Sequence, residues 1–378
     1  MGEKNGAEKK PKAVKGASGA PAFAKATAAY EAWLGEQMTL VPADLARKHA
    51  QMRLTGLGFL RATFYRWAQL WPIHCPELAD APRVLAVGDL HIENFGTWRD
   101  IEGRLVWGVN DFDEACQMPY ALDLVRLAAS ALISAKEGVL AIAADEVCPA
   151  ILKGYRSALK EGGRPFVLGE DGEWLRALAI ADLRDPDRFA RKLHALTEPS
   201  YSVSRKLKAA LGERMPQAGL KLELKHRVAG LGSLGRQRVV ALAQWYGGIV
   251  VREAKPLTTS AWVWAGGTGS SRVAYDEIIA RADRCPDPYA HLEGRWIIRR
   301  LAADSSSIEI DRLPGDKGRR LLGAMGKETA NIHLGVARKT ILQDLKARPE
   351  DWLEKAAHRM VEATLADWGA WKAASDHN

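Results

Sequence analysis

Apolar residues recur at every third or fourth position in several stretches of the chain, a spacing that predicts amphipathic helices. In the first stretch, about 25–70, glycines at 56 and 58 interrupt the apolar stripe. That stripe consists of Leu54, Leu57, Leu60, Phe64 and Trp67. Further helices are expected at about 119–134, 139–160, 172–197, 272–283, 316–337 and 349–373.

Shorter apolar runs, rich in β-branched residues and bounded by polar or glycine-containing segments, predict strands. They lie at 84–87, 104–109, 249–255, 295–301 and 306–311. The first two strands are expected to be joined by a turn at Glu102 and Gly103. The stretch 200–226 is basic and carries Pro216 and several glycines, which predicts irregular structure. Helices and strands together predict an α+β protein.

Length and charge add little to this picture. A chain of 378 residues is long enough for two lobes with a sizeable core. The net charge is +8, but residues 1–25 carry six Lys against two Glu and so account for +4 of it. The composition of this tail predicts disorder, and we favour a solubilising extension over a tether for nucleic acid. Nucleic acid is therefore not expected as a partner.

Two features bear on the cellular compartment. No apolar run approaches the roughly 20 residues needed to span a membrane, and the first 25 residues lack the apolar core of a secretion signal. The cysteines form no C-x-x-C pair, which excludes the familiar zinc spacings and predicts buried thiols. They are Cys75, Cys116, Cys148 and Cys285. We expect a cytoplasmic protein without a membrane partner.

Two acidic segments carry most of the candidate chemistry. Residues 88–96 read Gly-Asp-Leu-His-Ile-Glu-Asn-Phe-Gly, and residues 110–114 read Asn-Asp-Phe-Asp-Glu. Asp89 and Asn94 are five positions apart, the spacing of the kinase catalytic loop, where the Asp accepts the substrate hydroxyl proton and the Asn holds Mg²⁺. Asp111 then stands where a second metal-holding carboxylate is expected. The alternative is a pair of polar loops in which Asp and Asn serve only as turn residues.

The two segments resemble motifs of known phosphotransferases. The first is similar to the Gly-Asp-x-His-x-x-Asn loop of aminoglycoside and choline phosphotransferases, and the second to their Ile-Asp-Phe-x-x-Ala segment. Residues 123–130 read Asp-Leu-Val-Arg-Leu-Ala-Ala-Ser. With that run, the segments resemble an uncharacterised bacterial family, domain of unknown function 2252, of the protein-kinase-like superfamily.

The resemblance implies a role for each polar residue of these segments. Asp89 would be the catalytic base. Mg²⁺ would be held by Asn94 and Asp111, and Asp113 could take over as a metal ligand. The residues that would support the loop structurally are His91 and Asp123.

A glycine-rich segment further along the chain has the pattern G-x-G-x-x-G, formed by Gly230, Gly232 and Gly235. A dinucleotide-binding fold requires a strand before it, a helix after it and then an acidic residue about 20 positions on. A kinase-type loop requires a β-hairpin over the phosphates and then a strand with a basic residue. A basic strand follows here, which favours the kinase-type loop, whose glycines allow the backbone to approach phosphate closely.

The base that anchors the phosphates is left open between two residues. Lys255 has the residue type that the role expects. The resembling family, however, reads Lys-Glu-Ala where this chain reads Arg252-Glu-Ala, so Arg252 could take the role instead. The two side chains point to opposite faces of a regular strand, so only one can serve. Asp276 or Glu277 could pair with that base, or both could belong to a solvated helical face.

The order of these parts differs from that of an ordinary kinase, because the glycine loop comes after the catalytic loop. This order predicts a two-lobed, circularly permuted protein-kinase-like fold. The alternative is that the glycine match is accidental and that the nucleotide lobe is something else. The expected parts are a basic tail at 1–25, a catalytic part at 26–225, a nucleotide-binding part at 226–315 and C-terminal helices returning to the catalytic part at 316–378.

The resulting expectation is an ATP- and Mg²⁺-dependent phosphotransferase that acts on a hydroxyl of a small molecule. Two alternatives on the same fold are a nucleotide-binding, pseudokinase-like regulator without turnover and a transferase of AMP. A nucleic-acid binder is a third alternative, which rests on charge alone. No motif identifies the acceptor, and the sequence leaves the oligomeric state open.

Overall fold

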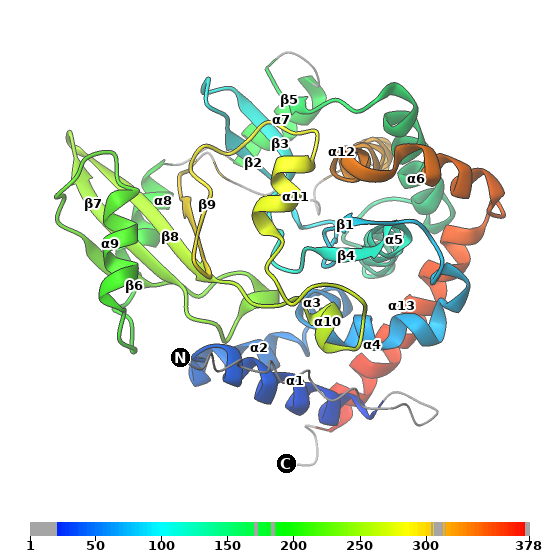
Figure 1. Ribbon diagram of the computed structural model, residues 1–378, viewed down its shortest axis with the longest axis horizontal. Helices are drawn as coiled ribbons and strands as arrows, with labels where there is room; N and C mark the ends of the chain where they lie inside the picture. Colours follow the sequence, from blue (N-terminus) through cyan, green and yellow to red (C-terminus); the bar gives the residue numbers. More distant parts are fainter. Residues whose placement is uncertain are drawn as a thin grey trace, which may run out of the picture.

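A five-stranded sheet lies on one side of the molecule and most of the long helices lie on the other, as the computed structural model shows (Figure 1). The expected tail lies outside the described residues up to position 20. The first helix begins at Phe23, inside the range expected for that tail. The structure describes residues 21–169, 173–182, 186–303, 305, 313 and 315–374.

Four helices occupy the stretch expected to be helical at 25–70. They are α1 (Phe23–Gln37), α2 (Pro42–Gln51), α3 (Gly56–Ala62) and α4 (Phe64–His74). Gly56 starts a helix because the Thr55 hydroxyl accepts a hydrogen bond from Gly58 N at 2.9 Å and so caps the N-terminus of α3. A 3₁₀ turn, η1 (Pro76–Leu78), leads to the first strand.

Five short strands form two small antiparallel sheets in the N-terminal half. Their bounds are β1 (Arg83–Ala86), β2 (Phe95–Arg99), β3 (Leu105–Val109), β4 (Cys116–Pro119) and β5 (Phe166–Val167). The expected turn at 102 and 103 joins β2 to β3, and β1 pairs with β4 instead. The expectation that this turn joins the strands at 84–87 and 104–109 is therefore wrong. The reason is that residues 95–99 form a further strand in register with β3.

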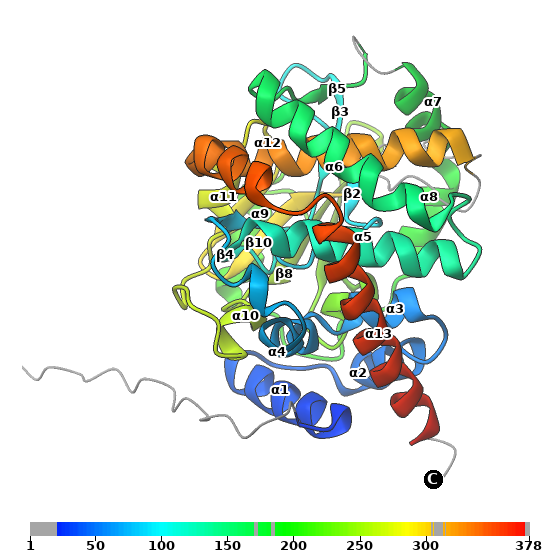
Figure 2. The ribbon, with the colours of Figure 1, turned by 90° about the vertical axis from the view of Figure 1, so that its right-hand side faces the viewer.

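Two long helices, at 120–136 and 315–347, pack against these sheets, and two more pack on those helices. Their bounds are α5 (Tyr120–Lys136), α6 (Ala144–Glu161), α12 (Gly315–Ala347) and α13 (Trp352–Ala373). The side chains of α5 are buried from Tyr120 to Ser134. α6 and α12 lie side by side in both views (Figures 1 and 2). The two helices approach closely because Gly154 has no side chain at the crossing. A Cβ atom there would lie only 1.9 Å from Gly323 O.

The second half of the chain forms the larger sheet, whose strands are antiparallel in the order β6-β7-β8-β10-β9. The strands are β6 (Glu223–His226), β7 (Val239–Trp245), β8 (Gly248–Pro256), β9 (His291–Glu293) and β10 (Trp296–Arg300). The remaining short helices are α7 (Glu173–Asp182), α8 (Pro186–His194), α9 (Arg205–Glu213), α10 (Ala261–Trp264) and α11 (Tyr275–Arg281).

The stretch 200–226 is more regular than its composition predicts, since it contains both α9 and β6. Leu207, Ala210 and Leu211 lie at helical spacing and are buried against the sheet. The Lys and Arg residues of α9 lie on its outer face. Their number made the apolar stripe hard to recognise in the sequence. The expected strand at 306–311 lies outside the described residues.

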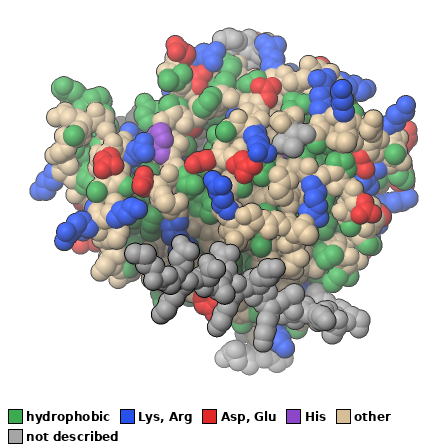
Figure 3. All heavy atoms as spheres, viewed as in Figure 1, with side chains coloured by type: hydrophobic (Ala, Val, Ile, Leu, Met, Phe, Trp, Pro, Cys, Tyr) green, Lys and Arg blue, Asp and Glu red, His purple; other side chains and the backbone are tan. Residues whose placement is uncertain are grey.

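The mixed α+β class that the pattern predicts is confirmed. Among the described helices, none has the length and apolar character required to cross a membrane. All four cysteines are free thiols. On the face shown in Figure 3, basic and acidic side chains are interspersed.

Candidate functional site

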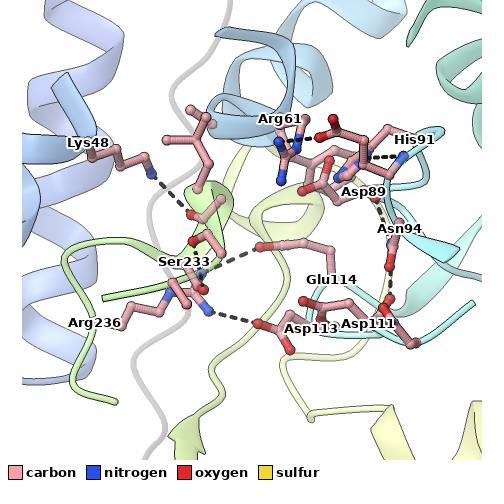
Figure 4. Close-up of a pocket in the computed structure, with 18 of the residues that line it drawn as sticks. Lys48, Arg61, Asp89, His91, Asn94, Asp111, Asp113, Glu114, Ser233 and Arg236 are labelled. Atoms are coloured by element: carbon pink, nitrogen blue, oxygen red, sulfur yellow. Dashed lines mark hydrogen bonds and ion pairs between the residues drawn. The ribbon is translucent and has the colours of Figure 1, made fainter. Parts of the chain in front are cut away.

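The two acidic segments and the glycine-rich loop line one cavity of about 270 Å³ (Figure 4). Asp89 and Gly232 both line it, although they come from opposite halves of the chain, so only folding brings them together. The acidic segments contribute Asp89, His91, Asn94, Asp111 and Asp113 to its wall.

Asp89 follows β1 through a position that requires glycine. Gly88 has φ +81°, and a Cβ atom there would lie 2.8 Å from a neighbouring backbone oxygen. Asp123 of α5 accepts hydrogen bonds from Val87 N at 2.7 Å and from Gly88 N at 2.8 Å. His333 Nε2 lies 3.0 Å from the same carboxylate. Asp123 thus links the loop before Asp89 to two buried helices.

Arg126, also on α5, holds one oxygen of the Asp89 carboxylate. Its Nε and Nη2 atoms donate to Asp89 Oδ1 at 2.9 and 2.5 Å. The buried guanidinium lies over the rings of Phe64 and Trp67, 5.0 and 4.9 Å from their centroids. Burial raises the pKa of Asp89, and Arg126 opposes that shift. Sequence reasoning missed Arg126, although it lies in the segment that carried the family resemblance.

Asn94 joins the two acidic segments and keeps an acceptor available. Its Nδ2 atom donates to Asp89 O and to Asp111 O, both at 3.1 Å. Its Oδ1 atom is buried without a hydrogen-bond partner, so it can serve as a metal ligand. Within the described parts of the chain, no group of three or more His, Cys, Asp or Glu is arranged to hold a metal ion. Oxygens of Asn94 and Asp111 nevertheless suit Mg²⁺, which commonly completes its shell with water and substrate phosphates.

Lys255, and not Arg252, faces this site. Lys255 Nζ lies 3.1 Å from Asp111 Oδ2 and 2.6 Å from Asp113 Oδ1. Arg252 lies on the other face of β8, where its Nε atom donates to Arg214 O at 2.7 Å. The two residues are three positions apart on one strand and therefore point in opposite directions.

The pKa values of the two carboxylates beside Lys255 are shifted in opposite directions. Burial would raise the pKa of Asp111, but Lys255 holds it well below its ordinary value. Burial and the charge of Asp111 raise the pKa of Asp113. The Asp111 side chain is 39% exposed and that of Asp113 is 11% exposed. Asp111 is therefore the carboxylate better suited to a metal ion.

Glu277 does not reach either candidate base. It is exposed on α11 and pairs with Arg281 at 2.8 Å, and Asp276 is also exposed. The expectation that one of these acids pairs with the phosphate-anchoring base is wrong. The reason is that α11 packs through Tyr275 and Ile278, which leaves both acids on its outer face. The acidic partners of Lys255 come from the 110–114 segment instead.

The glycine-rich loop connects β6 to β7, which form a hairpin, and it contains the 3₁₀ turn η2 (Leu231–Ser233). A Cβ atom on Gly232 would lie 3.4 Å from Asp89 Oδ2, so the loop covers Asp89. The N-terminal helices hold this loop: Lys48 Nζ donates to Gly232 O at 3.2 Å, and Val41 N donates to Gly235 O at 2.8 Å. Figure 4 shows Lys48 reaching the loop from the side opposite Asp89.

Sequence reasoning missed further residues of the cavity wall. Lys48 is buried, which lowers its pKa to about 8, and nothing in its sequence context distinguishes it from a surface lysine. Glu114 accepts a hydrogen bond from Ala261 N at 2.6 Å, and burial raises the pKa of Glu114 to about 7. Its position directly after Asp113 was the one available signal. Tyr30 and Arg236 also line the cavity.

Arg61 and His91 complete the wall near Asp89. Arg61 pairs with Glu93 at the cavity. His91 is buried, and its Nδ1 atom accepts a hydrogen bond from Glu93 N at 3.2 Å. Burial and the nearby Arg61 lower the pKa of His91 well below its ordinary value, so the ring is neutral. A neutral His91 fits a role in holding the loop.

A second cavity of about 210 Å³ adjoins the first and shares Asn110, Arg227 and Arg299 with it. Its wall carries three aromatic rings and the guanidinium of Arg284, which stacks 4.5 Å from the centroid of Trp98. The aromatic residues are Trp98, Phe112 and Tyr275. Both cavities thus combine charged side chains with aromatic rings, since the first is also lined by Tyr30, Phe64 and Tyr65.

Comparison with known proteins confirms part of the expected relationship. Residues 40–198 match the family described as an uncharacterized protein conserved in bacteria (DUF2252). This region contains both acidic segments and the 123–130 run, and it is similar to the family that the motifs predict. No match was found among curated proteins or among solved structures.

Proposed function

We propose that this chain is an ATP- and Mg²⁺-dependent phosphotransferase that acts on a hydroxyl group of a small molecule. The observation that carries the proposal is the convergence of Asp89, Asn94 and Asp111 with the glycine-rich loop around one cavity, with Lys255 paired to Asp111. A kinase site has a glycine loop over the phosphates, a lysine on the third strand and an Asp and Asn below. β8, which carries Lys255, is third in the order β6-β7-β8.

The chemistry required of the protein is mostly positioning and charge neutralisation. The acceptor hydroxyl oxygen would form a bond to the γ-phosphorus while the bond from that phosphorus to the bridging oxygen breaks, which releases ADP. The hydroxyl proton would pass to Asp89. Mg²⁺, held by Asn94 and Asp111, would supply charge neutralisation at the phosphate oxygens. Lys255 forms ion pairs with both Asp111 and Asp113 and so holds these two carboxylates next to each other.

The two adjoining cavities support a nucleotide as the phosphate donor. A nucleotide combines a charged chain with a flat base, and the cavities combine charged side chains with aromatic rings. The proposal includes a circularly permuted kinase-like fold. In it, the five-stranded sheet that would bind the nucleotide follows the catalytic loop in the chain instead of preceding it. Support for this order comes from the glycine loop, which lies over Asp89.

One observation favours the alternative of a nucleotide-binding regulator without turnover. Arg126 neutralises Asp89 through two hydrogen bonds, which makes the carboxylate a weaker proton acceptor. The same site geometry is compatible with transfer of AMP, since the reacting phosphate depends on how the nucleotide lies. The position of the isotope label separates transfer of the γ-phosphate, transfer of AMP and the absence of transfer.

The test is a metabolite-library screen with ATP labelled at the γ- or the α-phosphate. We expect γ-label to reach a hydroxyl compound, and Asp89→Asn to lower the rate about 10²–10⁴-fold while ATP binding persists. Asp80→Asn, at an exposed aspartate outside the cavity, is the matched control. Full turnover by Asp89→Asn would overturn the assignment of the base. Transfer of α-label would identify a nucleotidyl transferase, and ATP binding without any transfer would favour the regulator.

A further inference from the structure

Three arginines surround one buried carboxylate at the sheet side of the cavity. The carboxylate belongs to Glu253 in the middle of β8, and its side chain is fully buried. Arg227 Nη1 lies 2.5 Å from Glu253 Oε1, while Arg238 Nη1 and Arg299 Nη2 lie 3.1 and 3.0 Å from Oε2. The three guanidiniums come from positions just after β6, just before β7 and within β10.

Glu253 is ionised and compensates only one of the three charges. Burial would raise the pKa of Glu253, but Arg238, Arg227 and Arg299 hold it well below its ordinary value. The three arginines and Glu253 together carry a formal charge of +2, which the charge of Asp111 reduces beside Arg299. All three arginines line the first cavity, so this excess faces the space below the glycine loop.

The carboxylate also arranges the guanidiniums as a preformed set of donors. Each guanidinium has five N–H groups in a planar fork, more than its contacts with Glu253 engage. Arg238 Nη2 makes one more contact, to Ser233 Oγ of the glycine loop at 2.7 Å. Such a set suits the paired oxygens of a phosphate, whereas a neutral group placed against it would leave two charges uncompensated.

We propose that Arg227, Arg238 and Arg299 form an anion subsite for a phosphate group, separate from the place where Asn94 and Asp111 would hold metal-bound phosphate. The inference rests on the proposed function in taking that ligand to be a nucleotide. Arg227 and Arg299 also line the second cavity, which carries the rings of Trp98, Phe112 and Tyr275. The phosphate bound by the arginines is therefore the one nearer the base, and the metal-bound phosphates lie further along the chain of the nucleotide.

The test measures binding of inorganic pyrophosphate and of ADP to the full chain by calorimetry, without added metal. Arg227→Met is the best variant because its side chain is 32% exposed and Glu253 keeps two other arginines. We expect the Kd for both probes to rise about tenfold or more, with an intermediate effect in Arg227→Lys, which keeps the charge but loses the fork. Arg252→Met is the matched control, a buried arginine of the same sheet that lies outside the cavity.

The outcomes separate this inference from the proposed function. Unchanged binding by a folded Arg227→Met variant, an equal loss in Arg252→Met, or no pyrophosphate binding by the native chain would overturn the subsite. A loss for both probes assigns the subsite to a nucleotide, and a loss for pyrophosphate alone assigns it to an inorganic polyphosphate. Because neither measurement involves turnover, a failure of γ-phosphate transfer would refute the proposed function and leave the subsite standing.

Discussion

Arg126 donates two hydrogen bonds to one oxygen of Asp89, at 2.9 and 2.5 Å, from a fully buried position on α5. The other oxygen, Asp89 Oδ2, faces the glycine loop at Gly232. One oxygen is therefore held and the other is directed into the cavity, which is the arrangement needed by a positioned proton acceptor.

Replacement of Arg126 should shift the pH dependence of transfer. Burial raises the pKa of Asp89 and Arg126 lowers it, so Arg126→Met should raise that pKa further. Since the base must be deprotonated, the acidic limb of the pH–rate profile should move to higher pH. Arg126→Lys, which keeps the charge, should restore part of the profile. The measurement is kcat/KM against pH with the acceptor found in the screen, and an unshifted limb in a folded Arg126→Met variant would contradict the role.

Asp111 and Asp113 should differ in their effect on the metal requirement. Asp111→Ala should raise the Mg²⁺ concentration needed for half-maximal turnover and lower kcat more than Asp113→Ala does. The reason is that Asp111 is the more exposed carboxylate and has the lowered pKa. Titration of turnover with Mg²⁺ checks the ranking. A larger Mg²⁺ shift in Asp113→Ala would move the metal site two residues along the chain.

The glycine loop should tolerate no side chain above Asp89. In Gly232→Val the Cβ atom would meet a backbone oxygen of Arg61 at 3.0 Å and Asp89 Oδ2 at 3.4 Å. We expect ATP binding to weaken because the side chain occupies space between the loop and Asp89. Calorimetry with ATP measures this. The control is Gly369→Val on α13, where a Cβ atom meets nothing within 4 Å. Equal affinity in both variants would argue against phosphate binding under the loop.

Glu328 should make stability depend on pH. Burial beneath β3 raises its pKa from 4.5 to about 7, so the folded chain holds a proton that the unfolded chain has lost between these values. The stabilisation from protonated Glu328 is thus complete below about pH 4.5 and is lost as the pH rises through about 7. The total loss in the free energy of unfolding is on the order of 3 kcal/mol. Glu328→Gln, which stays neutral, should gain stability relative to the native chain over this window.

Urea unfolding at several pH values from 5 to 8 measures that difference. The control is Glu362→Gln, an exposed glutamate on α13, whose stability should follow that of the native chain. A difference between native chain and Glu328→Gln that stays constant across the window would show that Glu328 does not titrate in it.

Much of the fold follows from local patterns. The helices around 119–134, 139–160 and 349–373 were predictable because an amphipathic stripe requires only residues a few positions apart. The turn expected between 84–87 and 104–109 was wrong because strand pairing depends on which segments meet in space. A strand of five residues, β2, carries too few positions for its alternation to be distinctive.

The sequence by itself determined the two acidic segments, the glycine pattern, and the choice of Asp89, Asn94 and Asp111, because these depend on spacing within short segments. Only the tertiary structure decided between Lys255 and Arg252, since that choice depends on which face of β8 meets the cavity. It also revealed Arg126, Lys48 and the arginines around Glu253. Their roles arise from burial and from charges brought together by folding, and no local pattern records either.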